Sequence, residues 1–129
     1  MRTLIQNGTV VTASETFAAD LLIEGERVAA LLRSGGPEAQ AIVAGGARVI
    51  DAAGCYLLPG GIDAHTHLDM PFGGTNSIDD FESGTTAAAH GGTTTLIDFA
   101  IQKKGESLRS ALDTWHQKAA GKAVIDYGF

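Results

Sequence analysis

From Tyr56 onward, apolar strand patterns alternate with helical patterns, and this alternation constrains the fold of the chain more than any other feature. Three apolar or β-branched runs predict strands at 56–67, 93–100 and 123–127. The intervals between them are long enough for one helix each. The resulting order, β-α-β-α-β, predicts an α/β fold with a parallel sheet and right-handed crossovers.

Helical signals fill both of these intervals. Ser77 is a suitable N-cap for the first helix, with Asp80 as its third residue. Gly91-Gly92 is expected to end this helix, because glycine readily adopts the left-handed conformation that follows a helix. The second helix has the clearer pattern, with apolar residues at three- and four-residue spacing: Leu108, Ala111, Leu112, Trp115 and Ala119.

Residues 1–55 carry a different pattern, in which short strands are separated by turn residues. Asn7-Gly8 and Gly25-Glu26 are each predicted to form the turn of a hairpin. Ser34-Gly35-Gly36-Pro37 is predicted to be a loop, and Arg48-Val49-Ile50-Asp51 a further short strand. Strands so few and so short cannot bury both of their faces, so we expect this sheet to need another partner.

His65 and His67 lie at the end of the strand predicted over 56–67. Side chains two residues apart in a strand share one face, about 6.5–7 Å apart along the strand, so the two imidazoles can converge on a single divalent ion. A chance H-x-H on a strand is common, and a catalytic zinc site needs at least three protein ligands. The pair therefore predicts one part of a metal site.

The composition limits the partners and compartments that fit the chain. The 129 residues carry a net charge of −6, and no basic cluster is present, which argues against nucleic acid or an anionic membrane surface as a partner. Cys55 is the only cysteine, so neither an intrachain disulfide nor a thiolate-rich zinc site is expected. No run approaches the ~20 apolar residues of a membrane span. We expect a cytoplasmic protein.

Several motifs along the whole chain carry a family resemblance. They are L-I-Q-N-G-T-V-V, A-D-L-L-I-E-G-E-R-V, V-I-D-A-A-G, P-G-G-I-D-A-H-T-H-L-D-M-P-F-G-G-T, G-G-T-T-T-L-I-D-F-A and D-Y-G-F. Together they resemble the amidohydrolase superfamily and, within it, the cyclic amidase branch of dihydropyrimidinases and hydantoinases. The H-x-H after P-G-G-I-D carries the superfamily resemblance, and the continuation L-D-M-P-F-G-G-T narrows it to this branch.

The resemblance implies a TIM (β/α)₈ barrel joined to a small β-sandwich-like domain. Residues 1–55 would be the amino-terminal part of the sandwich, and residues 56–129 the first β-α-β-α-β units of the barrel. A complete barrel of this kind typically takes about 250 residues. We therefore expect the chain to be the amino-terminal piece of a longer protein and to be inactive by itself.

The resemblance also implies a two-metal centre, usually zinc, in which His65 and His67 bind one ion. A carboxylated lysine that bridges the metals, two further histidines and a catalytic aspartate are expected beyond residue 129, so no catalytic residue is assigned within this chain. The implied reaction is hydrolysis of a dihydropyrimidine or hydantoin ring to an N-carbamoyl amino acid. A homotetramer or homodimer is implied for the full-length protein.

Other residues near the histidines have two interpretations each. Met70 and Phe72 are expected to form an apolar lip over the substrate, with ordinary loop packing as the alternative. Asp63 and Asp69 share the parity of the histidines if the strand stays extended, so either could orient an imidazole or stabilise a turn. His90, at a helix end, is interpreted as structural.

Competing functions remain open from the sequence. Allantoinase and dihydroorotase share the superfamily and the H-x-H, and a non-catalytic scaffold paralogue would share the fold. A cupin-type module also uses H-x-H, but that pattern requires a glutamate four or five residues after the second histidine. Pro71 and Phe72 occupy those positions here, and the alternating helices also argue against a cupin.

Overall fold

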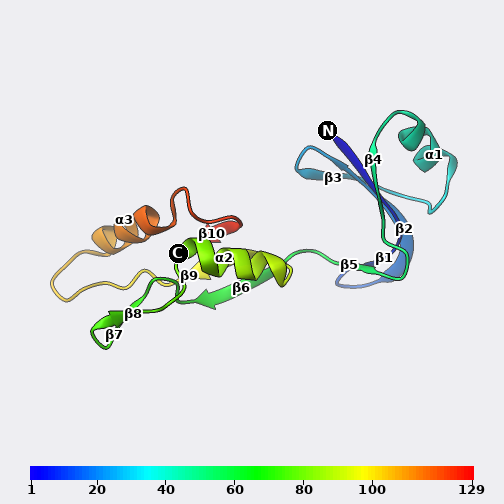
Figure 1. The fold of residues 1–129 in the computed structure, drawn as a ribbon. Coiled ribbons are helices and arrows are strands. Elements are labelled where there is room, and N and C mark those ends of the chain that lie inside the picture. The colour runs from blue at the N-terminus through cyan, green and yellow to red at the C-terminus, as the bar shows by residue number, and fades with distance from the viewer. The chain divides into compact units, whose positions relative to one another are not determined.

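The computed structural model describes all 129 residues, which divide into two compact units, Met1–Pro59 and Gly60–Phe129 (Figure 1). The predicted domain boundary lies between residues 55 and 56. The membership of the first unit in a β-sandwich domain stays a prediction. The three helices of the chain fall short of the length and apolarity that a membrane crossing requires.

The first unit is a five-stranded sheet with one helix. Its strands are β1 (Arg2–Val11), β2 (Thr16–Glu24), β3 (Arg27–Leu32), β4 (Arg48–Asp51) and β5 (Tyr56–Leu57). The order is β3-β2-β1-β4, with β5 also paired to β1; β2 runs antiparallel to β1 and β3, whereas β4 and β5 run parallel to β1. Helix α1 (Pro37–Ala44) contributes Ala39 to a small core with Leu4 and Leu22.

Two predictions for this unit are wrong and two are confirmed, one of which is the strand at Arg48–Asp51. Asn7-Gly8 does not form a hairpin, because β1 continues through it with a register shift between Ile5 and Gly8. Asn7 does adopt a positive φ of 63°, but at this irregularity, where its backbone amide donates to Asp20 Oδ1 at 3.0 Å. The loop predicted over 34–37 is shorter, because Pro37 begins α1, a position that suits its fixed φ. The hairpin turn at Gly25-Glu26 is confirmed between β2 and β3.

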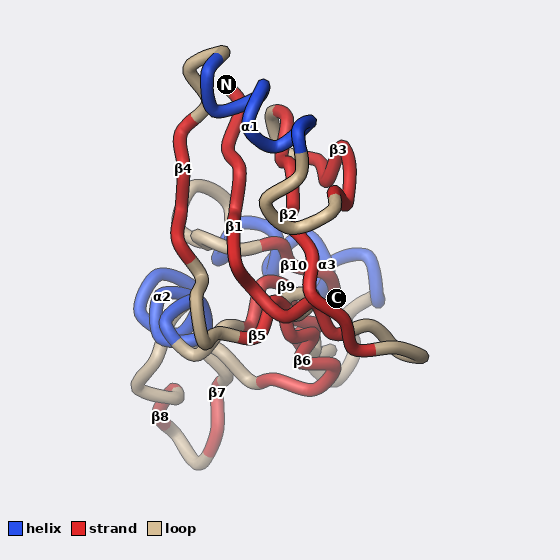
Figure 2. Tube along the Cα trace, turned by 90° about the vertical axis from the view of Figure 1, so that its right-hand side faces the viewer, coloured by secondary structure: helices blue, strands red, loops and turns tan.

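The second unit has the predicted β-α-β-α-β order. A parallel sheet in the order β10-β9-β6 contains β6 (Gly61–Thr66), β9 (Thr93–Asp98) and β10 (Asp126–Gly128), drawn as red tubes in Figure 2. Helices α2 (Phe81–His90) and α3 (Leu108–Ala119) connect these strands. A short hairpin of β7 (Pro71–Phe72) and β8 (Thr75–Asn76) lies between β6 and α2.

Both helices of the second unit pack on the same face of its sheet. Phe81 from α2 and Trp115 and Ala119 from α3 form one buried core with Leu96 of β9. Crossover helices on a single face are typical of a barrel, whereas a doubly wound sheet has helices on both faces. The α/β class is confirmed, and three strands by themselves do not close a barrel.

The first predicted strand of this unit needs one correction. The run 56–67 is not one strand: Tyr56-Leu57 pairs with β1 of the first unit, and the parallel strand begins only at Gly61. A continuous apolar run hides this break, although Pro59 lacks the backbone N–H that a strand interior needs.

The start of α2 also differs from the prediction. Asp80, and not Ser77, is the N-cap, and its carboxylate accepts hydrogen bonds from the backbone amides of Glu82 and Ser83, both at 3.0 Å. The Ser83 hydroxyl accepts in return from the Asp80 amide at 3.2 Å, which completes a capping box. Ser77 instead accepts a hydrogen bond from the Met70 amide at 2.8 Å and so closes the hairpin loop.

Gly60 lies where the chain enters β6, and we predict that Gly60→Ala destabilises the second unit. A Cβ on Gly60 would lie 2.0 Å from Oγ1 and 2.7 Å from Cβ of Thr94. Rotation of Thr94 cannot move its Cβ, so the backbone of β6 or β9 must shift, at a cost of about 1–3 kcal/mol. The denaturant midpoint of unfolding should fall accordingly.

Gly61→Ala is the matched control, because the nearest atom to a Cβ there is Thr93 Oγ1 at 3.4 Å, an ordinary contact. Gly60 and Gly61 are neighbours, so the two variants differ mainly in this clash. Equal unfolding midpoints for the two variants would contradict the prediction.

Candidate metal centre

The two predicted metal ligands converge at the carboxyl end of β6. His65 is the penultimate residue of the strand, and His67 follows its last residue. Their Nε2 atoms lie 3.2 Å apart, and the two rings are nearly perpendicular, with an interplanar angle of 79°. Both side chains are exposed. The structure therefore brings together the pair that the sequence singles out.

Alternation along the strand places the histidines on the face opposite the helices. Thr66, between them, directs its hydroxyl to the buried carboxylate of Asp98, at 3.0 Å. Asp98 lies on the helix-covered face, where it also accepts a hydrogen bond from the Trp115 indole at 2.9 Å. Neighbouring side chains of a strand point to opposite faces, so His65 and His67 lie on the uncovered face of the sheet.

Phe99 forms an apolar wall beside the pair. Its ring centroid lies 4.4 Å from that of His65 and 5.6 Å from that of His67. Sequence reasoning missed this residue. The signal was available, because Phe99 directly follows the last residue of β9 and the carboxyl ends of neighbouring parallel strands meet at one sheet edge.

The spacing of the two nitrogens fits one tetrahedral metal ion. Zinc binds histidine nitrogen at about 2.0–2.1 Å, and two such nitrogens in tetrahedral geometry lie about 3.3–3.4 Å apart. The observed 3.2 Å is close to this value. Without an ion, the same distance suits a hydrogen bond between two neutral imidazoles, one of which donates.

The pair supplies only part of a complete site. No group of three or more histidine, cysteine, aspartate or glutamate side chains in the structure is placed to hold a metal ion. Two protein ligands fall short of the three that a catalytic zinc site requires. Any further ligand must therefore come from a residue that does not lie beside the two histidines in this structure.

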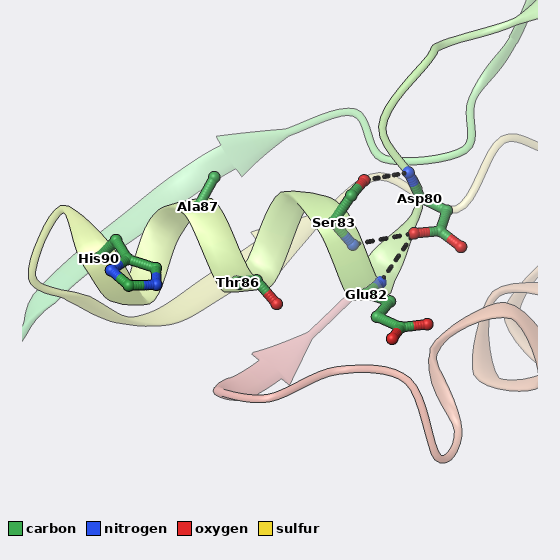
Figure 3. Close-up of a pocket in the computed structure, with 6 residues that line it drawn as sticks. All are labelled: Asp80, Glu82, Ser83, Thr86, Ala87 and His90. Atoms are coloured by element: carbon green, nitrogen blue, oxygen red, sulfur yellow. Dashed lines mark hydrogen bonds between the residues drawn. The ribbon is translucent and has the colours of Figure 1, made fainter.

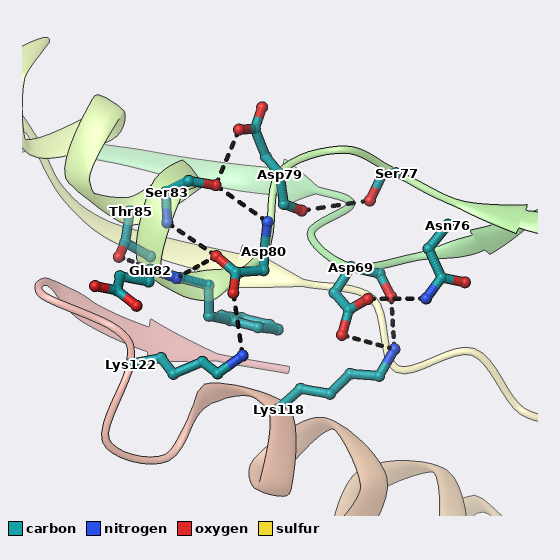
Figure 4. A network of polar contacts seen from close by, with 11 residues as sticks. Asp69, Asn76, Ser77, Asp79, Asp80, Glu82, Ser83, Thr85, Lys118 and Lys122 are labelled. Carbon is teal, nitrogen blue, oxygen red and sulfur yellow. Dashed lines mark hydrogen bonds and ion pairs between the residues drawn. The ribbon is translucent and has the colours of Figure 1, made fainter.

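The two aspartates that share the parity of the histidines do not contact an imidazole. Asp63 accepts a hydrogen bond from the backbone amide of His65 at 3.1 Å. Asp69, at a positive φ of 47°, pairs with Lys118 of α3 at 3.4 Å and accepts from Asn76 Nδ2 at 3.0 Å (Figure 4). These contacts support the turn-stabilising interpretation of Asp69 over the one in which it orients an imidazole.

Met70 and Phe72, the predicted substrate lip, lie in the short hairpin loop. Met70 is half-buried, whereas Phe72 in β7 is 76% exposed. Gly73-Gly74 joins β7 to β8 with φ values of 59° and 84°, which suits a tight two-residue turn. The loop is anchored at its ends by Asp69 and Ser77. Its role as a lip stays a prediction.

A shallow pocket lies along α2 (Figure 3). Its lining residues are Asp80, Glu82, Ser83, Thr86, Ala87 and His90. The hydrogen bond from the Ser83 amide, with that from Lys122 Nζ at 3.0 Å, holds the pKa of Asp80 at about 2 (Figure 4). At one end of the pocket, the polar atoms of Asp80 and Ser83 are already engaged in the capping box. His90 lies exposed at the other end. The structural interpretation of His90 suits this position.

A comparison with protein families decides the affiliation of the chain. The model of the amidohydrolase family matches residues 56–129, more than half of the sequence, including the histidine pair. The chain belongs to the amidohydrolase family. The resemblance stated from the motifs is confirmed.

Individual amidohydrolases are similar to the whole chain. A D-hydantoinase from Geobacillus stearothermophilus is 60% identical over 129 residues, which is 100% of this chain and 26% of that protein. A dihydropyrimidinase from Rattus norvegicus is 48% identical over 126 residues, 98% of this chain and 24% of that protein. The chain thus spans about a quarter of the length of these relatives.

A solved amidohydrolase structure has the same fold over these residues. The crystal structure of a dihydropyrimidinase from Brevibacillus agri superposes with a TM-score of 0.90 at 61% sequence identity. The match covers 100% of this chain and 26% of that one. The arrangement of strands and helices described above is therefore that of a known amidohydrolase.

Proposed function

We propose that the chain is part of a metal-dependent hydrolase that opens cyclic amides, dihydropyrimidine or hydantoin rings, to N-carbamoyl amino acids. One observation carries the proposal: the Nε2 atoms of His65 and His67 converge at 3.2 Å at the carboxyl end of a parallel strand. This is the edge at which barrel enzymes of the α/β class place their active sites. The similarity to D-hydantoinases and dihydropyrimidinases supports the choice of substrate class.

His65 and His67 would hold one of two divalent ions, zinc in our proposal. The carboxylated lysine, the two further histidines and the catalytic aspartate are expected outside the 129 residues. When bound, such ions polarise a carbonyl and lower the pKa of a bound water, which generates the nucleophile for amide hydrolysis. The spacing of the two nitrogens supports this assignment.

The chain's own residues shape the surroundings of the pair. Phe99 lies against the His65 ring and shields one side of it from water, which strengthens electrostatic interactions at the site. Asp63 accepts the His65 backbone amide and so fixes the backbone beside the first ligand. Met70 and Phe72 are proposed to cover the substrate from the hairpin loop.

The position of both helices on one face supports a barrel as the architecture of the whole protein. In this proposal β6, β9 and β10 are the first three barrel strands, and the first unit belongs to a β-sandwich-like domain. A homotetramer or homodimer and a cytoplasmic location stay predictions.

Metal removal tests the proposed function. Dialysis of the enzyme that contains this chain against a chelator is expected to abolish the hydrolysis of hydantoin and dihydrouracil, and added Zn²⁺ is expected to restore it. Release of the N-carbamoyl amino acid and the metal content, measured by mass spectrometry, check this outcome. Full activity in a preparation shown to be free of divalent metal would contradict the proposal.

A further inference from the structure

Asp98 is a buried charged residue that the proposed chemistry does not use. It is the last residue of β9 and is 1% exposed, so its carboxylate needs hydrogen-bond partners within the protein. Three donors meet it. Oδ1 accepts from Trp115 Nε1 at 2.9 Å, and Oδ2 accepts from the Thr66 hydroxyl at 3.0 Å and from the Leu68 amide at 2.7 Å.

The two donors on Oδ2 are the residues on either side of His67. Thr66 is the last residue of β6 and the last partner of β9 in the register of the sheet. The register shifts between Asp63 and Thr66, so the ladder is irregular at the point where the histidines lie. One carboxylate oxygen thus holds the chain just before and just after His67.

The other end of the same carboxylate is anchored in the core. Trp115 is 3% exposed and packs with Phe81, Leu96 and Ala119 between the helices and the sheet. Its indole N–H fixes Oδ1, which leaves Oδ2 directed at the segment around His67. Hydrogen bonds to an ionised carboxylate are stronger than those between neutral groups. The rigid core therefore extends through Asp98 to the backbone at the histidine.

We propose that Asp98 is a positioning residue for the metal-binding pair: it holds the backbone of His67 so that the two Nε2 atoms stay at the spacing that suits an ion. The inference rests on the proposed function, because it assumes that the pair binds metal. Asp98 lies on the opposite face of the sheet and acts only through Thr66 and Leu68.

Asp98→Asn in the enzyme that contains this chain is the test. An amide offers one oxygen and one NH₂ group, so it must turn the NH₂ group toward either Trp115 or the Thr66–Leu68 pair of donors. The replacement should loosen the segment at His67. We expect the affinity for Zn²⁺, measured by competition with a chelator, to fall about 10–100-fold, as is typical when a residue that orients a ligand is removed.

A second readout follows the backbone directly. Hydrogen–deuterium exchange with mass spectrometry should show faster exchange in the peptide that contains Leu68. Its 2.7 Å hydrogen bond to Oδ2 is lost if the NH₂ group faces the Leu68 amide, and it is weaker if the neutral amide oxygen accepts it instead of a carboxylate. Thr66→Val, nearly isosteric, removes only the hydroxyl donor. It should give a smaller loss of zinc affinity in the same direction, and it keeps the test available if Asp98→Asn does not fold.

Leu96→Val is the matched control. Leu96 is two residues away on the same strand and belongs to the same core, against which Leu68 also packs, but its side chain makes no hydrogen bond to Thr66 or Leu68. A similar fall in Tm with unchanged zinc affinity would show that Asp98 acts on the site and not only on stability. Equal losses of zinc affinity in Leu96→Val and Asp98→Asn, or normal affinity in Asp98→Asn, would overturn the inference.

The variant His65→Ala distinguishes a failure of the proposed function from a failure of the positioning role of Asp98. If His65→Ala retains both metal and activity, the pair is not a metal site, whatever Asp98 does. If His65→Ala loses metal but Asp98→Asn binds Zn²⁺ as the wild type does, the proposed function stands and only the positioning role is wrong.

Discussion

Replacement of His65 by alanine in the enzyme that contains this chain is expected to reduce the hydrolysis of hydantoin and dihydrouracil to background. The variant removes one of the two nitrogens that converge at 3.2 Å, and His67 alone cannot hold an ion at this corner of the site. The loss of Lewis acidity and of the activated water removes the chemistry that an amide bond requires. Turnover and bound zinc per subunit, measured on the same preparation, should fall together.

His90→Ala provides the matched control. His90 is also exposed, but it is the last residue of α2, at the end of the helix opposite to the capping box. The variant His90→Ala should leave turnover and zinc content unchanged. This result would show that the effect of His65→Ala comes from the loss of that imidazole and not from the loss of any histidine. Near-normal turnover of His65→Ala with normal metal content would refute the ligand assignment.

The elements that the sequence predicts best are those stabilised by local patterns. Helix α3 contains all five apolar residues that predicted it, because these residues recur at helical spacing and Ser107 caps the helix through the Ser110 amide. The hairpin of β2 and β3 is likewise decided by Gly25, whose positive φ of 62° suits the turn. Such signals lie within one turn or one hairpin, so neighbouring residues suffice to predict them.

The errors concern choices that distant residues decide. Asn7 has the left-handed conformation expected of a turn residue, but Asp20 and Asp51 accept its hydrogen bonds and keep it within β1. Tyr56 and Leu57 have strand character, yet their partner is β1 and not β9. Local propensity predicted a turn at Asn7 and a strand at Tyr56-Leu57, and it could not identify the distant partners that decide both conformations.

The same distinction applies to the site. The convergence of His65 and His67 was predictable, because two-residue spacing in a strand is a local rule. The contacts of Asp98 were not, since they join residues that are 30 and 32 positions apart. In the sequence, a single acidic residue at the end of a strand does not indicate that it will accept hydrogen bonds from the residues around a histidine at the end of the neighbouring strand in the sheet.

The 129-residue chain on its own is expected to show no hydrolysis of hydantoin or dihydrouracil and to bind Zn²⁺ only weakly. The reason is the ligand count: the structure offers two convergent imidazoles, and no third histidine, cysteine or carboxylate is placed to hold an ion together with them. Calorimetric titration of the purified chain with Zn²⁺, next to an activity assay at high protein concentration, measures both outcomes.

The double variant His65→Ala/His67→Ala of the same chain decides what any weak binding means. If the pair is the site, the double variant should lose this binding, while its circular dichroism stays that of the wild type because both side chains are exposed. Equal zinc binding by the two chains would place the ion elsewhere. Turnover of either substrate by the purified chain would show that two imidazoles suffice for catalysis. This result would contradict the two-metal proposal, which requires further ligands.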